Sequence, residues 1–278
     1  MIDFVKETFS LLPFLFATYL ALEAVEARAG GALGSFLGRA RSVGPFAGAL
    51  AGAVPQCGIS AAASGFYAGG VITLGTLLSV FLSTSDELLP VLFSERVPLS
   101  LIAKIAAIKV CCAIAAGFAV DGVISLMRLP RREVSIAKLC EHSRCHCSRH
   151  RGIVVPALIH TAEIFLFIVA VSAAVELAMH YFGEDCLHEL CLNRPFAGEL
   201  VAAAVGLVPN CAVSVAGAKL YLAGAMAPGA MMAASFSGSG IGLLVLFRAN
   251  RSLKENLLVL ALIYVFGVVF GYLAGFLF

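Results

Sequence analysis

The chain has 278 residues, of which 60% are hydrophobic and 13% are charged. Soluble domains have about 45–50% apolar and about 25% charged residues. The net charge is +2, and the charged residues gather in short stretches between long apolar ones. This composition excludes a disordered chain, a disulfide-stapled secreted domain and a nucleic-acid-binding protein, because no broad basic surface remains to contact phosphates. It predicts a protein of the lipid bilayer.

Four apolar stretches are each long enough for a helix that crosses the membrane, which needs about 20 residues. They are residues 8–27, 98–120, 153–181 and 255–278. The chain begins Met-Ile-Asp, with no basic region before the first of these stretches, so we expect a permanent helix rather than a secretory signal peptide. Two longer apolar regions, 45–94 and 197–247, are each interrupted twice.

The first interruption in each long region is a proline turn, Pro-Gln-Cys at 55–57 and Pro-Asn-Cys at 209–211. The second is Ser-Thr-Ser-Asp-Glu at 83–87 and Ser-Gly-Ser-Gly at 237–240. Proline lacks the N–H that a continuing helix needs, and Gly and Ser loosen the backbone ladder. We therefore expect helices that break inside the membrane. A break costs several kcal/mol for each unsatisfied backbone group, so it favours a functional role over a plain scaffold.

The chain is predicted to be a duplication. Residues 54–93 align without a gap on 208–247 at an offset of 154, with 14 identities in 40 positions. The identical Pro, Cys, Tyr, Gly and Ser residues are the main evidence for the duplication. Matching Leu, Ala and Val residues are weaker evidence, because two apolar segments share them by chance. The predicted organisation is a first repeat at 1–120, a linker at 121–152 and a second repeat at 153–278.

Charge predicts the topology, because Lys and Arg in short loops favour the cytoplasm. Segments 28–44, 121–152 and 248–254 are basic, whereas 182–196 is acidic. The fold class that satisfies this pattern is an all-α polytopic protein of the inner membrane, built from two inverted repeats of about 150 residues. Each repeat has three full helices, one of them broken, and one re-entrant hairpin at the Pro-X-Cys turn. Both termini are expected outside. Inverted repeats with broken helices are typical of secondary transporters.

The turns and breaks of the two halves are expected to converge on one midplane cavity. Their amides, thiols and hydroxyls are the predicted substrate ligands: Gln56, Cys57, Ser60, Ser83, Thr84, Ser85, Asn210, Cys211, Ser214, Ser237 and Ser239. Two thiols related by pseudo-symmetry suit a soft metal or a metalloid. The alternative is that each cysteine is a small apolar filler in a tight turn.

One place breaks the internal symmetry: Asp86 and Glu87 correspond to glycine and isoleucine in the second half. A carboxylate within a membrane span is a functional candidate when a partner can be named. The candidates are Lys104 and Lys109, and the predicted role is coupling to a proton or an ion; a static buried ion pair is the alternative. His160 is a further coupling candidate because a histidine can titrate near neutral pH; a solvated or helix-capping residue is the alternative.

The linker is rich in metal ligands, and we expect it to capture or sense zinc or a similar ion. Three thiols and three imidazoles can supply a tetrahedral site: Cys140, His142, Cys145, His146, Cys147 and His150. A solvated loop with incidental cysteines is the alternative. No cofactor is expected to be required. No phosphate-binding loop and no hydrolase or zinc-protease motif occurs, so no enzyme activity is expected.

Several segments resemble the ten-transmembrane heavy-metal exporters, whose members are labelled manganese transporter or arsenic efflux protein, an arsenic-permease-like family. The residues that carry the resemblance are 54–58, 73–76, 81–87, 160–161, 208–211 and 242–248. The resemblance covers nearly the whole chain. The resemblance implies ten membrane segments. The predicted topology also has ten, if each of the two hairpins is counted as two segments beside the six full helices.

The leading hypothesis is a secondary-active exporter of a heavy-metal or metalloid species that works by alternating access with proton or ion coupling. The first alternative is a permease for a small organic or oxyanionic substrate, and the second is an intramembrane enzyme. The expected partners are the lipid bilayer, a metal, metalloid or small anionic substrate, and a second copy of the chain in a homo-oligomer; nucleic acid is not expected.

We predict that Asp86→Asn abolishes gradient-coupled transport while the protein still folds and binds substrate, and that Glu87→Gln has a similar or milder effect. In a low dielectric, desolvation favours a neutral carboxyl group whereas a neighbouring lysine favours the charged form. Such a balance suits a group that binds and releases a proton in each cycle. Transport measured against pH in vesicles tests this, and an unchanged pH dependence in both variants would make the pair structural.

Overall fold

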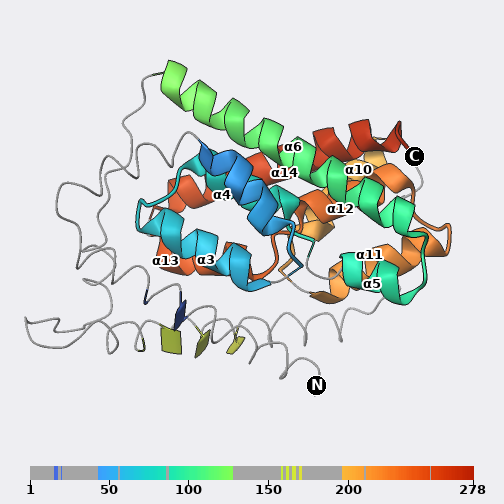
Figure 1. The fold of residues 1–278 in the computed structure, drawn as a ribbon, viewed down its shortest axis with the longest axis horizontal. Helices are drawn as coiled ribbons and strands as arrows, with labels where there is room; N and C mark the ends of the chain where they lie inside the picture. The colour runs from blue at the N-terminus through green and yellow to red at the C-terminus, as the bar shows by residue number, and fades with distance from the viewer. Residues whose placement is uncertain are drawn as a thin grey trace, which may run out of the picture.

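The computed structural model describes residues 16–17, 20, 43–55, 57–85, 88–127, 158, 161–162, 165–166, 169–170, 196–209, 211–250 and 252–278, with the backbone alone for Cys57 and 211–213. Of these residues 81% are helical, and none of them forms a strand (Figure 1). The predicted all-α class is therefore confirmed for the described part of the chain.

The described helices of the first half begin with a short helix, Val43–Gly52. They continue with α3 (Cys57–Ala68), α4 (Leu74–Ser83), α5 (Leu88–Ser94) and α6 (Leu99–Leu126). The hydroxyl of Thr73 accepts from the N–H of Thr76 and so caps the start of α4. The predicted break after Ser83 is confirmed, because α4 ends there and α5 begins at Leu88. Helix α6 runs to Leu126, six residues beyond the predicted end of its apolar stretch at 120.

The second half repeats this order with α10 (Ala197–Gly206), α11 (Cys211–Leu222), α12 (Pro228–Ser237), α13 (Ile241–Ala249) and α14 (Leu253–Gly275). Four helix starts in this half, at 197, 211, 228 and 253, lie 154 residues after the starts at 43, 57, 74 and 99. The turn glycines obey the same offset, since Gly70 has φ 74° and Gly224 has φ 71°. The repeat seen in the sequence is thus a repeat of backbone structure across these helices.

Small residues let the helices within each half pack closely. Helix 43–52 runs alongside α4 in the same direction, with Gly44 beside Thr76 and Gly52 beside Ser83. Helix α6 runs the opposite way, and the hydroxyl of Ser79 on α4 donates to the carbonyl of Ala113 at 3.0 Å. The second half repeats both contacts: α12 packs against α10 and against α14.

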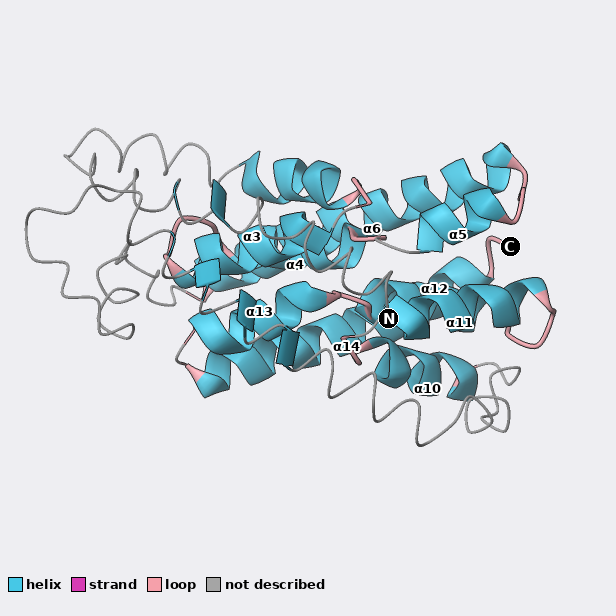
Figure 2. Cartoon of the chain, turned by 90° about the horizontal axis from the view of Figure 1, so that it is seen from below, coloured by secondary structure: helices cyan, strands magenta, loops and turns pink. Residues whose placement is uncertain are grey.

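The two halves contact each other at several places. Helix α3 packs against α13, and α5 packs against α11. The amine of Lys104, near the start of α6, donates to the carbonyl of Leu277, just beyond the end of α14, so these two long helices run in opposite directions. In both views α3, α4 and α13 gather toward one end of the molecule and α5, α10, α11 and α12 toward the other (Figure 1, Figure 2).

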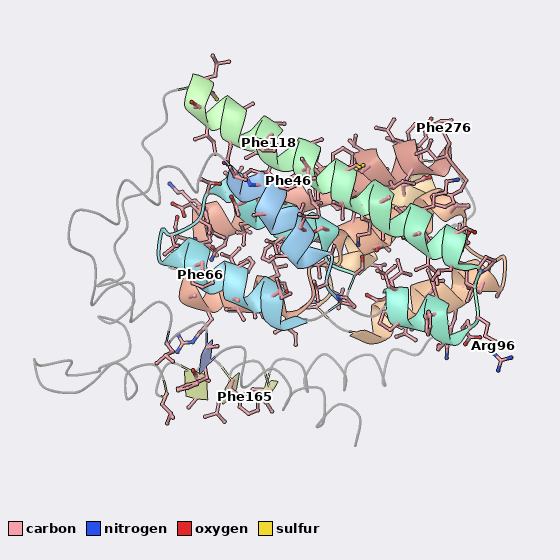
Figure 3. All side chains as sticks on the ribbon, in the orientation of Figure 1. Phe46, Phe66, Arg96, Phe118, Phe165 and Phe276 are labelled. Atoms are coloured by element: carbon pink, nitrogen blue, oxygen red, sulfur yellow. The ribbon has the colours of Figure 1, made fainter. Side chains whose placement is uncertain are left out.

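Four helical segments in the described residues are long and apolar enough to cross a membrane: Leu74–Ser94, Leu99–Leu126, Pro228–Ala249 and Leu253–Gly275. The outer faces of α6 and α14 carry exposed apolar side chains. Phe118 on α6 is 43% exposed and Phe276, after α14, is 73% exposed, and both point away from the helix bundle (Figure 3). Such faces suit contact with lipid, and we conclude that the chain is a membrane protein.

We predict that Gly242→Ala destabilises the protein by about 1–3 kcal/mol, the usual cost of overpacking a tight core. An ideal Cβ at Gly242 would lie 2.8 Å from Cβ and 2.9 Å from the carbonyl carbon of Ser60, so α13 would have to move away from α3. Chemical or thermal unfolding of the detergent-purified protein measures this.

The matched control is Gly122→Ala on α6, where an added Cβ meets nothing within 4 Å. This variant should be neutral or slightly stabilising, because alanine favours a helix over glycine by about 0.5–1 kcal/mol. Equal stability of the two variants would mean that α3 and α13 do not pack as closely as described.

Candidate substrate site at the helix breaks

Helix α4 ends in a run of hydroxyl side chains that bond the carbonyls of its own last turn. The Oγ atom of Ser83 donates to the carbonyl of Val80 at 3.0 Å, and Oγ1 of Thr84 donates to the same carbonyl at 2.7 Å. Thr84 leaves the helix with φ −56° and ψ 130°. Its own carbonyl therefore no longer has a partner inside the helix and needs one from another element.

Helix α12 also ends with a serine hydroxyl bonded to carbonyls of its own last turn, but the backbone conformation after it differs from that after α4. The Oγ atom of Ser237 donates to the carbonyls of Ala233 and Ala234, at 3.0 and 3.1 Å. Gly240 then adopts φ 55° and ψ −145° before α13 begins at Ile241. This conformation is essentially restricted to glycine, which explains why the second half carries Gly240 where the first half has Asp86.

Lys109 connects the two breaks. It lies near the middle of α6 and is fully buried. Its amine donates to the carbonyl of Thr84 at the end of α4. It also donates to Ser235 in the last turn of α12, to the carbonyl at 2.8 Å and to Oγ at 2.7 Å. The last carbonyls of a helix carry partial negative charge, so one cation satisfies the ends of two helices.

Near the start of α13 the two halves meet through a hydrogen bond. The hydroxyl of Ser64 on α3 donates to the carbonyl of Gly242 at 2.6 Å, and Ser60 lies fully buried against the same glycine. At the pseudo-equivalent contact of α11 with α5, the repeat places Ala218 and Leu88 in these positions. Alanine has no hydroxyl, so the α5–α11 contact lacks this bond. The two inter-half contacts are therefore alike in position and unlike in chemistry.

The predicted hydroxyl ligands that the structure describes are mostly buried. Six of them are fully or almost fully buried, namely Ser60, Ser83, Thr84, Ser85, Ser237 and Ser239, while Ser214 on α11 is half-buried. The hydroxyls of Ser83, Thr84, Ser85 and Ser237 donate to nearby carbonyls, as Ser85 does to Ser83 at 3.3 Å. Each oxygen keeps lone pairs that can accept from a substrate.

Of the two lysines expected beside the helix breaks, only Lys109 lies there. Lys104 is exposed, and its amine contacts the carbonyl of Leu277 and stands 4.5 Å from the centre of the Phe278 ring. Because it lies one and a half turns before Lys109 on α6, it reaches the end of α14 and not the breaks. Lys104 joins the two long helices, whereas its predicted partners Asp86 and Glu87 lie outside the described residues.

The remaining predictions lie outside the described residues. These are Gln56, Asn210, Asp86, Glu87, His160 and the linker ligands Cys140, His142, Cys145, His146, Cys147 and His150, together with the side chains of Cys57 and Cys211. The backbone of the two cysteines is described, and it places them at the first residues of α3 and α11.

Three polar residues at structurally important places were not predicted from the sequence. Ser235 binds Lys109, Asp121 caps α4, and Glu199 is buried in the first turn of α10. Asp121 had been assigned to the linker, although it lies within α6. A carboxylate inside the apolar run 197–206 was the available signal for Glu199.

No protein-family model, curated protein or solved structure matches this chain. Within the described ranges, no three His, Cys, Asp or Glu side chains come together as a metal site. The helix breaks and Lys109 are the features of the structure that bear on function.

We predict that Lys109→Met destabilises the protein strongly. It would leave the carbonyls of Thr84 and Ser235 buried without this donor, at about 1–3 kcal/mol for each unsatisfied group. The control is Lys104→Met, which removes an exposed amine and should cost about 1 kcal/mol or less. Unfolding in detergent measures both, and a Lys109→Met protein as stable as Lys104→Met would show that Lys109 does not hold the breaks together.

Proposed function

We propose that the chain is a secondary-active transporter of the inner membrane, with its substrate site between two broken helices of opposite direction. The observation that carries this proposal is the bridge from Lys109 to both breaks, α4–α5 and α12–α13. Broken helices that meet at the bilayer midplane supply the backbone groups that bind substrates in secondary transporters. A membrane scaffold without substrate would not need to pay for such breaks.

The helix directions support inverted repeats. Helix α4 runs opposite to α6, because its start contacts Asp121 and its end contacts Lys109. Helix α6 in turn runs opposite to α14 (Figure 1). Helix α14 also runs opposite to α12, since Gly271 lies beside Ala233 and Gly275 beside Gly229. It follows that α4 and α12, which are equivalent in the repeat, point in opposite directions. Each half would contain a full helix, a re-entrant hairpin, a broken helix and another full helix.

Helix lengths support the re-entrant hairpins. Helices α3 and α11 have 12 residues each and α10 has 10. At 1.5 Å per residue these helices rise about 15–18 Å, half of the roughly 30 Å hydrocarbon layer. A pair of such helices enters the membrane and returns to the same side. We place 28–44, 121–152 and 248–254 in the cytoplasm and both termini outside.

The mechanism that we propose is alternating access. The contact of α3 with α13 and that of α5 with α11 lie toward opposite ends of the molecule (Figure 1). If one half rocks against the other about Lys109, opening one contact closes the other. The substrate would then reach the midplane from one side of the membrane at a time.

The proposed cargo is a heavy-metal or metalloid species, moved outward in exchange for a proton or another ion. Cys57 and Cys211 support this, because they begin the two helices that follow the hairpin turns and sulfur prefers soft metals. A second candidate, a small oxyanion or organic anion, has support of its own. Helices α3, α5, α11 and α13 all begin near the breaks or hairpin turns, and helix N-termini favour anions.

We predict gradient-driven movement of Mn²⁺, Zn²⁺ or arsenite by the purified protein in proteoliposomes, and its loss in the Cys57→Ser, Cys211→Ser double variant. The matched control is Cys111→Ser, Cys112→Ser, which replaces two thiols on α6 and should leave transport intact. Movement of phosphate or arsenate that survives the loss of Cys57 and Cys211 would support the anion permease instead. Absence of any gradient-driven flux would refute the transporter.

A further inference from the structure

Glu199 is a buried acid without a complete set of partners. It lies in the first turn of α10 and is 5% exposed. Its Oε2 atom is buried and has no hydrogen-bond partner in the described structure. Its Oε1 atom faces the first turn of α12, where an ideal Cβ on Gly229 would lie 2.5 Å from it and 3.2 Å from the carbonyl of Gly271 on α14. The carboxyl group therefore fills the space where α10, α12 and α14 meet.

The first half places a carboxylate at the equivalent glycine in a different way. An ideal Cβ on Gly75, the repeat partner of Gly229, would lie 2.7 Å from Oδ1 of Asp121. Asp121 accepts from the hydroxyl of Thr73 at 2.6 Å and from the N–H of Gly75 at 2.9 Å. It is a satisfied cap on the first turn of α4, and it comes from α6 rather than from the helix equivalent to α10.

The second half provides fewer hydrogen-bond donors to Glu199 than the first half provides to Asp121. Ala227 stands where the first half has Thr73, so the donating hydroxyl is missing. Position 199 itself corresponds to Pro45, and position 121 corresponds to Gly275. Each half thus acquired its own acid at the start of its broken helix, and only the acid on α10 keeps a buried oxygen without a donor.

The helices around Glu199 contribute few titratable side chains. An ionised carboxylate that is buried without donors costs several kcal/mol, whereas a neutral acid costs about 1–3 kcal/mol for one unmade hydrogen bond. Helix α12 carries no titratable side chain. From α14, the hydroxyl of Tyr264 donates to the carbonyl of Leu200, and the ring of Tyr272 packs against Phe196. On α11 the titratable groups are Lys219, which is exposed, and Tyr221.

An ionised state has one natural stabiliser, the first turn of α12. Its N–H groups carry partial positive charge and point toward the side from which Glu199 approaches. A small shift of α10 against α12 would let these groups donate to the carboxylate, as Gly75 does to Asp121.

We propose that Glu199 is a proton-binding site that is protonated in the arrangement described and that releases its proton when α12 donates to it. Both helices at this site lead to the break: α10 and α12 end side by side, with Gly206 against Ser237 and Ala234. Gain or loss of the proton would shift this pair of helices at the midplane. The proton site stands without the proposed function, whereas its use for coupling rests on it.

Infrared difference spectroscopy of the purified full-length protein tests the proton site. We expect one protonated carboxyl band that shifts in heavy water, disappears at high pH and is absent from Glu199→Gln. Asp121→Asn is the control and should leave the protonated band in place. If Glu199→Gln does not fold, Glu199→Asp should still fold and shift the band. A protonated band that is unchanged in both Glu199 variants would overturn the proposal. Loss of an ionised carboxylate band in Glu199→Gln, in place of the protonated one, would also overturn it.

Transport in vesicles tests the coupling role separately. Glu199→Gln should still bind substrate, but its flux should no longer change with pH, whereas Asp121→Asn should keep the wild-type pH response. A normal pH response in Glu199→Gln, together with loss of the band, would keep the proton site and refute its use in coupling. A band that behaves as expected in a protein with no flux of any substrate would refute the proposed transport and leave the proton site in place.

Discussion

Backbone carbonyls freed at the ends of broken helices must find partners inside the protein, because lipid offers none. The structure meets this constraint with hydroxyls and one amine. Serine and threonine side chains close the last turns of α4 and α12, and Lys109 takes the carbonyl of Thr84 and that of Ser235. Burial of a charged amine is expensive, and its hydrogen bonds to the carbonyls at two helix ends offset part of that cost. The breaks, the buried lysine and the packing of the two halves are consequences of the same requirement.

Close packing around the breaks depends on small residues at repeated positions. Gly52 and Gly206 stand beside Ser83 and Ser237, and any Cβ there would strike the serine hydroxyl and the carbonyl behind it. The hydroxyls can therefore reach their carbonyls only because the neighbouring helix presents glycine. The equivalent positions of the two halves therefore share Gly and Ser here, while most apolar positions differ between the halves.

The two halves share a frame and differ in chemistry. Lys109, Asp121 and Glu199 have no charged counterparts at the equivalent positions, which are Ile263, Gly275 and Pro45. Each of these ionisable side chains lies where a helix end meets another helix, so the asymmetry is concentrated at the helix ends. A symmetric frame with unequal charges can have two conformations of different energy, and ligands or protons can then select between them.

Much of this organisation was determined by the sequence alone. Composition indicated the membrane, Pro, Gly and Ser marked the breaks, and the offset of 154 predicted which helices would be alike. These features are local or periodic, so they can be read along the chain. The partners of the polar groups could not be read in this way: Lys109 meets Ser235 across 126 residues, and Glu199 meets the first turn of α12 only because α10 lies beside it. Tertiary structure decided which charges are buried and what they contact, because hydrogen bonds and desolvation depend on distances in space and not on positions along the chain.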